Sequence, residues 1–167
     1  MIRKSVLSWV LASLFLSVAA AQSGPRPTAA VVRGHFAAIN KKVLDMAKDF
    51  PEDKYDFRLK PEMRSFGELI VHIASGNVYA AKVGRGEKVN WDEVDPKDYK
   101  TKAAVVALME KSINDATATL KSLKDESFAK TVDPWFDVTE HSAEHYGLLV
   151  AYYRANGLVP PASRPQK

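Results

Sequence analysis

Apolar side chains recur every three or four residues through most of this chain, and this period constrains the fold more than any other feature. Side chains at that spacing share one face of an α-helix. No segment alternates apolar and polar residues convincingly with a period of two, so no β-strand is predicted. We therefore expect an all-α fold. The first apolar stripe consists of Val32, Phe36, Ile39, Val43, Met46 and Phe50.

Local start and stop signals bound the first two predicted helices. The first begins at Thr28 and ends at Pro51, because proline has no backbone N–H with which to continue a helix. After a polar connector, the stretch Ser65-Phe-Gly-Glu68 has the form of a capping box, which starts the second helix. The glycines of Gly84-Arg85-Gly86 are expected to end it.

The third predicted helix lies between two longer connections. Residues 87–100 contain Pro96 and five acidic side chains, and we expect them to form a loop. Thr101 can then cap a helix that continues through Leu123. Residues 124–135 are expected to form a second loop.

The fourth predicted helix spans residues 136–155 and ends at Asn156-Gly157, which is a strong stop signal. Four helices divided in this way predict an antiparallel four-helix bundle with two longer connections. The domain is expected to cover residues 28–163, and residues 164–167 to form a C-terminal tail. A chain of this length can bury one hydrophobic core.

The N-terminal segment has the pattern of a secretory signal peptide. Two basic residues precede the apolar run Val6–Val18, and small residues follow at Ala19–Ala21. We expect residues 1–21 to be a signal peptide and residues 22–27 to be a flexible leader. The run is too short for a membrane span of about 20 apolar residues, so no stable membrane anchor is expected after cleavage. The protein is therefore expected to be exported, as a periplasmic or secreted protein.

Charge and cysteine content exclude several kinds of site. Cleavage would remove Arg3 and Lys4, which lowers the formal net charge from +4 to +2. The remaining lysines are interspersed with acids, so no basic block for phosphate binding is present and no nucleic-acid partner is expected. The absence of cysteine excludes disulfides, thiolate nucleophiles and thiolate metal ligands. Any metal must be held by histidine and oxygen.

Two histidines lie on the apolar face of the fourth helix. On a helical wheel His141 and His145 fall on the seam that also carries Val138 and Leu149. Imidazoles at positions i and i+4 stand one turn apart, which lets both reach one ion. Each buried ring nitrogen needs a partner, so two stacked histidines are harder to explain as core residues than one.

A third imidazole comes from His72, which points to the inner face of the second helix. Gly76 follows one turn later and leaves room for a close approach or for a ligand. Three neutral imidazoles from two helices, with positions left open, are typical of a catalytic metal site. The residues alone leave a second interpretation open, in which these are hydrogen-bonded core histidines. His35 is expected to be structural or exposed.

Two motif interpretations fail. The stretch His141-Ser-Ala-Glu-His145 matches the H-x-x-E-H pattern of inverted zinc peptidases, but those enzymes need a further acidic ligand downstream. No Asp or Glu follows His145. A di-iron carboxylate bundle needs Glu-x-x-His pairs, whereas Glu68 and His72 are four residues apart and Glu140 directly precedes His141.

Two stretches carry a family resemblance: PEDKYDFRLKPEMRSFGELIVHIASGN in the first half and EHSAEHYGLLVAYYRANGLVPPASR near the C-terminus. From about Ala30 to Ser163 the chain resembles the DinB-like superfamily of four-helix bundles. In that family one histidine of the second helix and an H-x-x-x-H pair of the last helix bind a divalent metal. These positions fall on His72, His141 and His145. We expect one divalent ion, zinc or nickel, because imidazole ligands suit both.

The resemblance implies an activity only in outline. Some relatives look like thiol-dependent transferases, but reduced small thiols are chiefly intracellular, which does not fit an exported chain. We expect a metal-dependent hydrolase or transferase of unknown small-molecule substrate. The alternative is a periplasmic metal- or small-ligand-binding protein without turnover. Glu144 or Glu140 could orient a ligand imidazole or shuttle a proton, or each could be a solvated charge on the helix surface.

Aromatic side chains give two further expectations. Tyr79, Tyr152 and Trp135 are expected either to line a pocket between the helices or to belong to the ordinary core. The region of Trp91 and Tyr99 could contribute to a homodimer.

Overall fold

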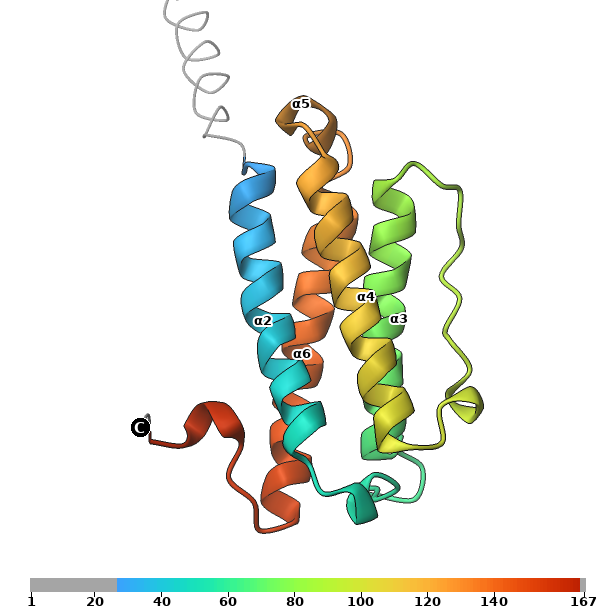
Figure 1. The fold of residues 1–167 in the computed structure, drawn as a ribbon, viewed down its shortest axis with the longest axis vertical. Helices are drawn as coiled ribbons and strands as arrows, with labels where there is room; N and C mark the ends of the chain where they lie inside the picture. The colour runs from blue at the N-terminus through green and yellow to red at the C-terminus, as the bar shows by residue number, and fades with distance from the viewer. Residues whose placement is uncertain (1–26, 166–167) are drawn as a thin grey trace, which may run out of the picture.

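The structure is a computed structural model that describes residues 27–165. The predicted signal peptide, residues 1–21, and the predicted leader up to residue 26 lie outside the described residues. The described part contains four long helices and no strand, which confirms the predicted all-α bundle (Figure 1). None of its helices combines the length and the apolarity that crossing a membrane requires.

The first two long helices start at the predicted caps. Helix α2 (Ala29–Asp49) begins after Thr28, whose hydroxyl accepts a hydrogen bond from the backbone N–H of the first turn. Helix α3 (Phe66–Gly84) begins with the capping box: the Ser65 hydroxyl accepts from the backbone N–H of Glu68, and the Glu68 carboxylate accepts from that of Ser65. These bonds satisfy backbone donors that a helix start otherwise leaves unpaired.

The second half of the chain follows the prediction less closely. Helix α4 (Lys102–Ser122) is capped by Thr101, as predicted. The expected loop after it contains a short helix, α5 (Asp125–Phe128), and helix α6 (Asp133–Ala155) begins three residues before the predicted start. The physical reason is Pro134, which fits the first turn of a helix because its missing N–H has no partner there. Two short 3-10 turns lie in the described connections, η1 (Glu52–Lys54) and η2 (Pro96–Asp98), and η3 (Pro161–Ser163) follows α6.

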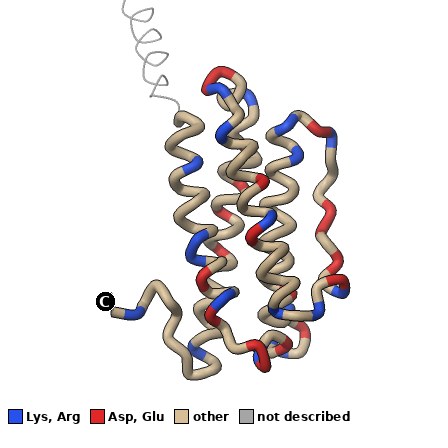
Figure 2. Tube along the Cα trace, in the orientation of Figure 1, with Lys and Arg blue, Asp and Glu red and all other residues tan. Residues whose placement is uncertain are grey.

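Helices α3 and α4 run in the same direction, whereas α2 and α6 run in the opposite one (Figure 1). The connection between α3 and α4, residues 85–101, descends along the whole length of the bundle beside α3 before α4 begins. Helix α3 packs against α4 and α6, and α2 packs against the same two helices. Figure 2 shows acidic residues spaced along the descending connection. One face of α3 is therefore covered by a segment of chain rather than by a helix.

The hydrophobic core has two parts. The larger part contains stacked rings of Phe50 and Phe66, whose centroids are 3.8 Å apart, and the fully buried Tyr152 and Tyr153. The smaller part surrounds Trp135, which is fully buried. Full burial of one large apolar side chain contributes about 2–3 kcal/mol to folding, so these rings are a main source of stability.

A hydrogen-bonded polar cluster crosses the bundle interior. The Asn77 side-chain amide donates to Oδ1 of Asn40 at 2.9 Å and to Oγ of Ser112 at 3.3 Å. Asn40 in turn donates to the carbonyl of Phe36 at 3.0 Å. The three polar side chains come from α2, α3 and α4, and all are buried. They join three helices through bonds that the chain itself completes.

Candidate metal centre

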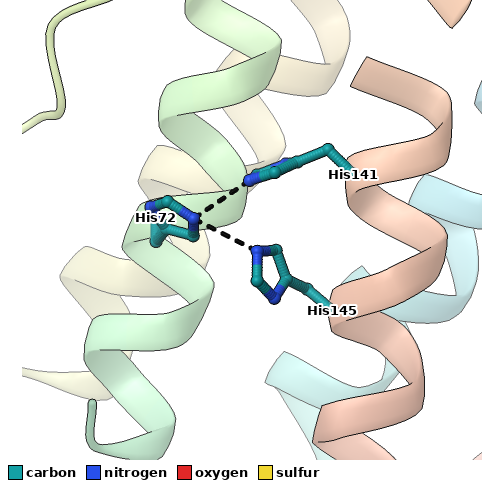
Figure 3. Close-up of side chains that lie close together, drawn as sticks. All are labelled: His72, His141 and His145. Atoms are coloured by element: carbon teal, nitrogen blue, oxygen red, sulfur yellow. Dashed lines mark hydrogen bonds between the residues drawn. The ribbon is translucent and has the colours of Figure 1, made fainter. Parts of the chain in front are cut away.

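The three histidines that the sequence singles out converge in space. His72 projects from α3 toward His141 and His145, which lie one turn apart on α6 (Figure 3). Nε2 of His72 lies 3.0 Å from Nε2 of His141 and 3.1 Å from Nε2 of His145. One ligand atom of each residue falls within 4.8 Å of the others. The histidines are thus positioned to hold a metal ion.

The spacing of these nitrogens fits a common cation. Metal–imidazole bonds of about 2.1 Å place two ligand nitrogens about 3.4 Å apart in a tetrahedral site and about 3 Å apart in an octahedral one. The separations of 3.0 and 3.1 Å lie at the short end of this range. Without an ion, protons on two of the Nε2 atoms would have to point at the third nitrogen to avoid lone-pair repulsion.

Electrostatics favour neutral imidazoles at this position. Burial is the largest cause that lowers the pKa of each of the three rings, because it disfavours the charged form. The pKa of His141 falls to about 4, since the neighbouring His145 and His72 add to the effect of burial. Neutral imidazole is the form that binds a metal, so the rings are in the required state at neutral pH.

Gly76 places the His141 ring. A Cβ atom at Gly76 would lie 3.1 Å from Nδ1 and 3.3 Å from Cε1 of His141, which is too tight for the present ring position. The space predicted beside Gly76 therefore allows the close approach of the His141 ring to α3. Nδ1 of His141 is buried and has no hydrogen-bond partner among the described residues. On its Nδ1 side the ring therefore lies against Gly76 without a hydrogen bond.

A carboxylate that the sequence did not single out contacts the cluster. Oε1 of Glu93 lies 3.0 Å from Nδ1 of His72, a hydrogen-bonding distance without the alignment of a full hydrogen bond. Oε2 of the same side chain lies 3.1 Å from Nη2 of Arg64 and accepts a hydrogen bond from it. Glu93 belongs to the descending connection. Four other acids lie there, and no sequence pattern distinguishes Glu93 from them.

The other candidate residues do not belong to the group of three histidines. Glu140 and Glu144 are exposed on α6, and the structure puts Glu93 rather than either of them against a ligand ring. The charge of Glu144 acts on His145 only through space, where it raises the pKa of that ring against the larger effect of burial. His35 is exposed on α2, outside the cluster.

A pocket of about 230 Å³ adjoins the cluster at His141. Tyr79 lines it, in agreement with the prediction, but Tyr152 and Trp135 do not. Tyr152 is fully buried, and its hydroxyl donates a hydrogen bond to the backbone carbonyl of Arg64. Trp135 lies in the first turn of α6 and belongs to the smaller part of the core. The full lining consists of Gly76, Tyr79, Trp91, Pro134, Asp137, Val138 and His141.

The Trp91 side chain is part of this site. Its ring centroid lies 5.8 Å from that of His141, 6.1 Å from that of His72 and 5.5 Å from that of Tyr79. Almost half of its surface, 47 %, is still exposed to solvent. The ring therefore forms a partly open wall between the imidazoles and water. Its contribution to a homodimer stays a prediction.

Comparison with known proteins agrees with the fold and with the histidine cluster. Among curated proteins none matches the chain. A family model described as the DinB superfamily matches residues 21–154, a range that includes all three histidines, Glu93 and nearly all of the four long helices. This chain belongs to the DinB superfamily.

Proposed function

We propose that the protein binds one divalent ion through His72, His141 and His145, and that it uses this site as an exported hydrolase or transferase of a small organic molecule. The observation that carries the proposal is the meeting of three neutral Nε2 atoms beside a pocket of about 230 Å³. A closed structural site has four protein ligands, whereas three histidines leave at least one position open.

Zinc or nickel is the proposed ion, because neutral imidazoles suit both. When bound, such an ion lowers the pKa of a coordinated water, hydroxyl or thiol and so supplies a nucleophile near neutral pH. His141 belongs to both the cluster and the pocket, which supports a reaction of a small molecule bound beside the ion.

The pocket residues have separate roles in this proposal. Tyr79 and Trp91 offer aromatic surface that can hold an apolar part of the substrate and exclude water from it. Among the described residues that line the pocket, Asp137 is the one with a charged side chain. Its carboxylate, one turn before His141, can accept a proton from a bound substrate.

Export rests on the N-terminal sequence. The basic residues, the apolar run Val6–Val18 and the small residues that follow have the order found in secretory signals. A cysteine-free chain also suits an oxidising compartment, because it has no thiol that could form an unwanted disulfide.

One observation favours a second function, a binding protein without turnover. Glu93, the carboxylate in contact with the cluster, lies on the Nδ1 side of His72, which faces away from the other two histidines. Asp137 in the pocket is exposed. A site without a buried general base beside the ion can hold a ligand without converting it.

Metal content is the first test. We expect the mature chain purified from the periplasm to carry one zinc or nickel ion, and the His72→Ala variant to carry none. The matched control is His35→Ala, which removes an exposed histidine and should keep the ion. An ion-free wild type, or equal metal content in His72→Ala, would falsify the proposal.

Turnover separates the two functions. The metal-loaded protein is assayed against a panel of small esters, amides and thiol conjugates, with the chelated protein and Asp137→Asn beside it. Hydrolysis or group transfer that is lost on chelation supports the enzyme. Saturable binding of a panel member that stays chemically unchanged supports the binding protein.

A further inference from the structure

We propose that Glu93 is a positioning residue for the histidine cluster, and that through it residues 91–94 act as a strap tying the descending connection to the site. This inference rests on the proposed function and assigns to the strap the control of metal affinity and of the pocket wall. The strap is defined as Trp91, Asp92, Glu93 and Val94.

The Glu93 carboxylate is held between two groups that are distant from it in sequence. One oxygen lies 3.0 Å from Nδ1 of His72 and the other 3.1 Å from Nη2 of Arg64, just before α3. Arg64 fixes the carboxylate by a charge-assisted hydrogen bond. A carboxylate in this place favours the proton of His72 on Nδ1. Nε2 then directs its lone pair at His141 and His145, which is the tautomer that a metal ligand requires.

The residues on both sides of Glu93 attach the strap to α3. The backbone N–H of Val94 donates to Oγ of Ser75 at 3.0 Å, and Ser75 is buried. On the other side, the Trp91 ring lies against Tyr79 and His141. The strap thus has a backbone attachment, a carboxylate on a ligand imidazole and a ring in the pocket wall, all within four residues.

Asp92 offers a matched comparison within the strap. It carries the same charge one residue away, is exposed, and forms no ion pair among the described residues. A general attraction between the acidic connection and a cation would depend on Asp92 and Glu93 to a similar degree. If Glu93 positions His72, the effect depends on Glu93 and not on Asp92.

The first experiment measures zinc affinity of the full mature chain by competition with a chelating dye. We expect Glu93→Ala to weaken zinc binding about 10- to 100-fold, the usual effect of removing the partner of a ligand histidine. Glu93→Gln should lose less, because its amide oxygen can still lie against Nδ1 and favour the proton there. Asp92→Asn should stay within about twofold of the wild type, since it leaves that contact intact.

The second readout is tryptophan fluorescence during the zinc titration. We expect a zinc-dependent change that Trp91→Phe abolishes, because Trp91 lies beside the imidazoles while Trp135 is fully buried elsewhere. In Glu93→Ala the change should be smaller even at saturating zinc, since the strap has lost its attachment to His72. A purely structural role for Glu93 would lower thermal stability without altering the saturated signal.

The outcomes separate this inference from the proposed function. A wild type that binds no zinc overturns both. A wild type that binds zinc, with Glu93→Ala and Glu93→Gln equal to it or all Glu93 and Asp92 variants equally weakened, overturns the strap alone. If Glu93→Ala does not fold, as judged by circular dichroism, the comparison of Glu93→Gln with Asp92→Asn decides.

Discussion

Helix α3 contributes to two polar clusters inside the bundle, and they differ in how their hydrogen-bonding groups are matched. Around Asn77, amide and hydroxyl donors face oxygen acceptors, with only Oδ1 of Asn77 left without a partner among the described residues. Around His72, the Nε2 atoms of His141 and His145 each lie about 3 Å from Nε2 of His72, and the three rings are half-buried next to a pocket.

The comparison teaches that a polar cluster in a helix bundle need not be structural. The amide donors of the asparagine cluster find acceptors within the described part of the chain, so its contribution is to stability and to the register of three helices. The histidine cluster consists of nitrogens that share the same chemistry, and a cation is the group that satisfies all three lone pairs together. Four predictions test this difference.

The largest expected effect is on metal affinity. His145→Ala should weaken zinc binding about a hundredfold or more, because a binding free energy of roughly 10 kcal/mol or more is shared among few ligands. The metal-free variant should unfold within about 1 kcal/mol of metal-free wild type, since the lost ring is half-buried and makes few bonds of its own. Isothermal titration and chemical denaturation in chelator measure the two quantities.

The opposite result is expected in the asparagine cluster. Asn77→Ala should lower the free energy of unfolding by about 2–3 kcal/mol, because it leaves a buried oxygen of Asn40 without its donor. The affinity for zinc should not change. Asn114→Ala, at an exposed position of α4, is the control and should alter neither. A loss of zinc binding in Asn77→Ala would contradict the separation of the two clusters.

A smaller effect on zinc affinity is expected at Gly76, where contact with the His141 ring can be distinguished from helix propensity. Gly76→Ala should weaken zinc binding about tenfold, because the new Cβ would lie 3.1 Å from Nδ1 of His141 and must displace the ring. Gly147→Ala on α6 meets no atom within 4 Å and is the matched control. Both variants gain up to about 1 kcal/mol of helix propensity. Equal zinc affinity in the two would show that the ring position does not matter.

The smallest effect is on the pH dependence of the metal-free protein. The folded state lowers the pKa of His72, His141 and His145 below the ordinary 6.5, to about 4 for His141. As the pH falls from 6.5, the unfolded chain binds protons that the folded chain does not, so stability decreases. Thermal melts in chelator between about pH 7 and 5 should show this decrease, above the range where carboxylates titrate. The decrease in stability should be smaller in His141→Ala. An equal decrease in that variant would contradict the assignment of this pH dependence to the three histidines.

Much of the fold could be predicted because its signals are local. The capping box at Ser65 and the cap at Thr101 act within one helical turn, and both helices begin where these residues indicate. The predicted start of α6 lies three residues late, because Pro134 is typical of a loop and equally suited to the first turn of a helix. The common direction of α3 and α4 depends on the path of a long connection, which no local pattern encodes.

The site divides in the same way. The three histidines could be predicted because helical periodicity places each of them on an inner face. Glu93 and Trp91 could not, since both lie on a connection without periodicity and reach the cluster through contacts with residues distant in sequence. Five acids lie in that connection, and only the folded path selects which one meets His72.

The contacts of His72 with His141 and His145 span 69 and 73 positions of the chain. An ion shared by these rings would tether the middle of the polypeptide to its last helix, as a disulfide does in many secreted proteins. Closing a loop of this size restricts the unfolded chain by about 4 kcal/mol in the entropic model of cross-links. Resistance to proteases would then depend on the supply of the metal, and the protein would be degraded fastest where that supply fails.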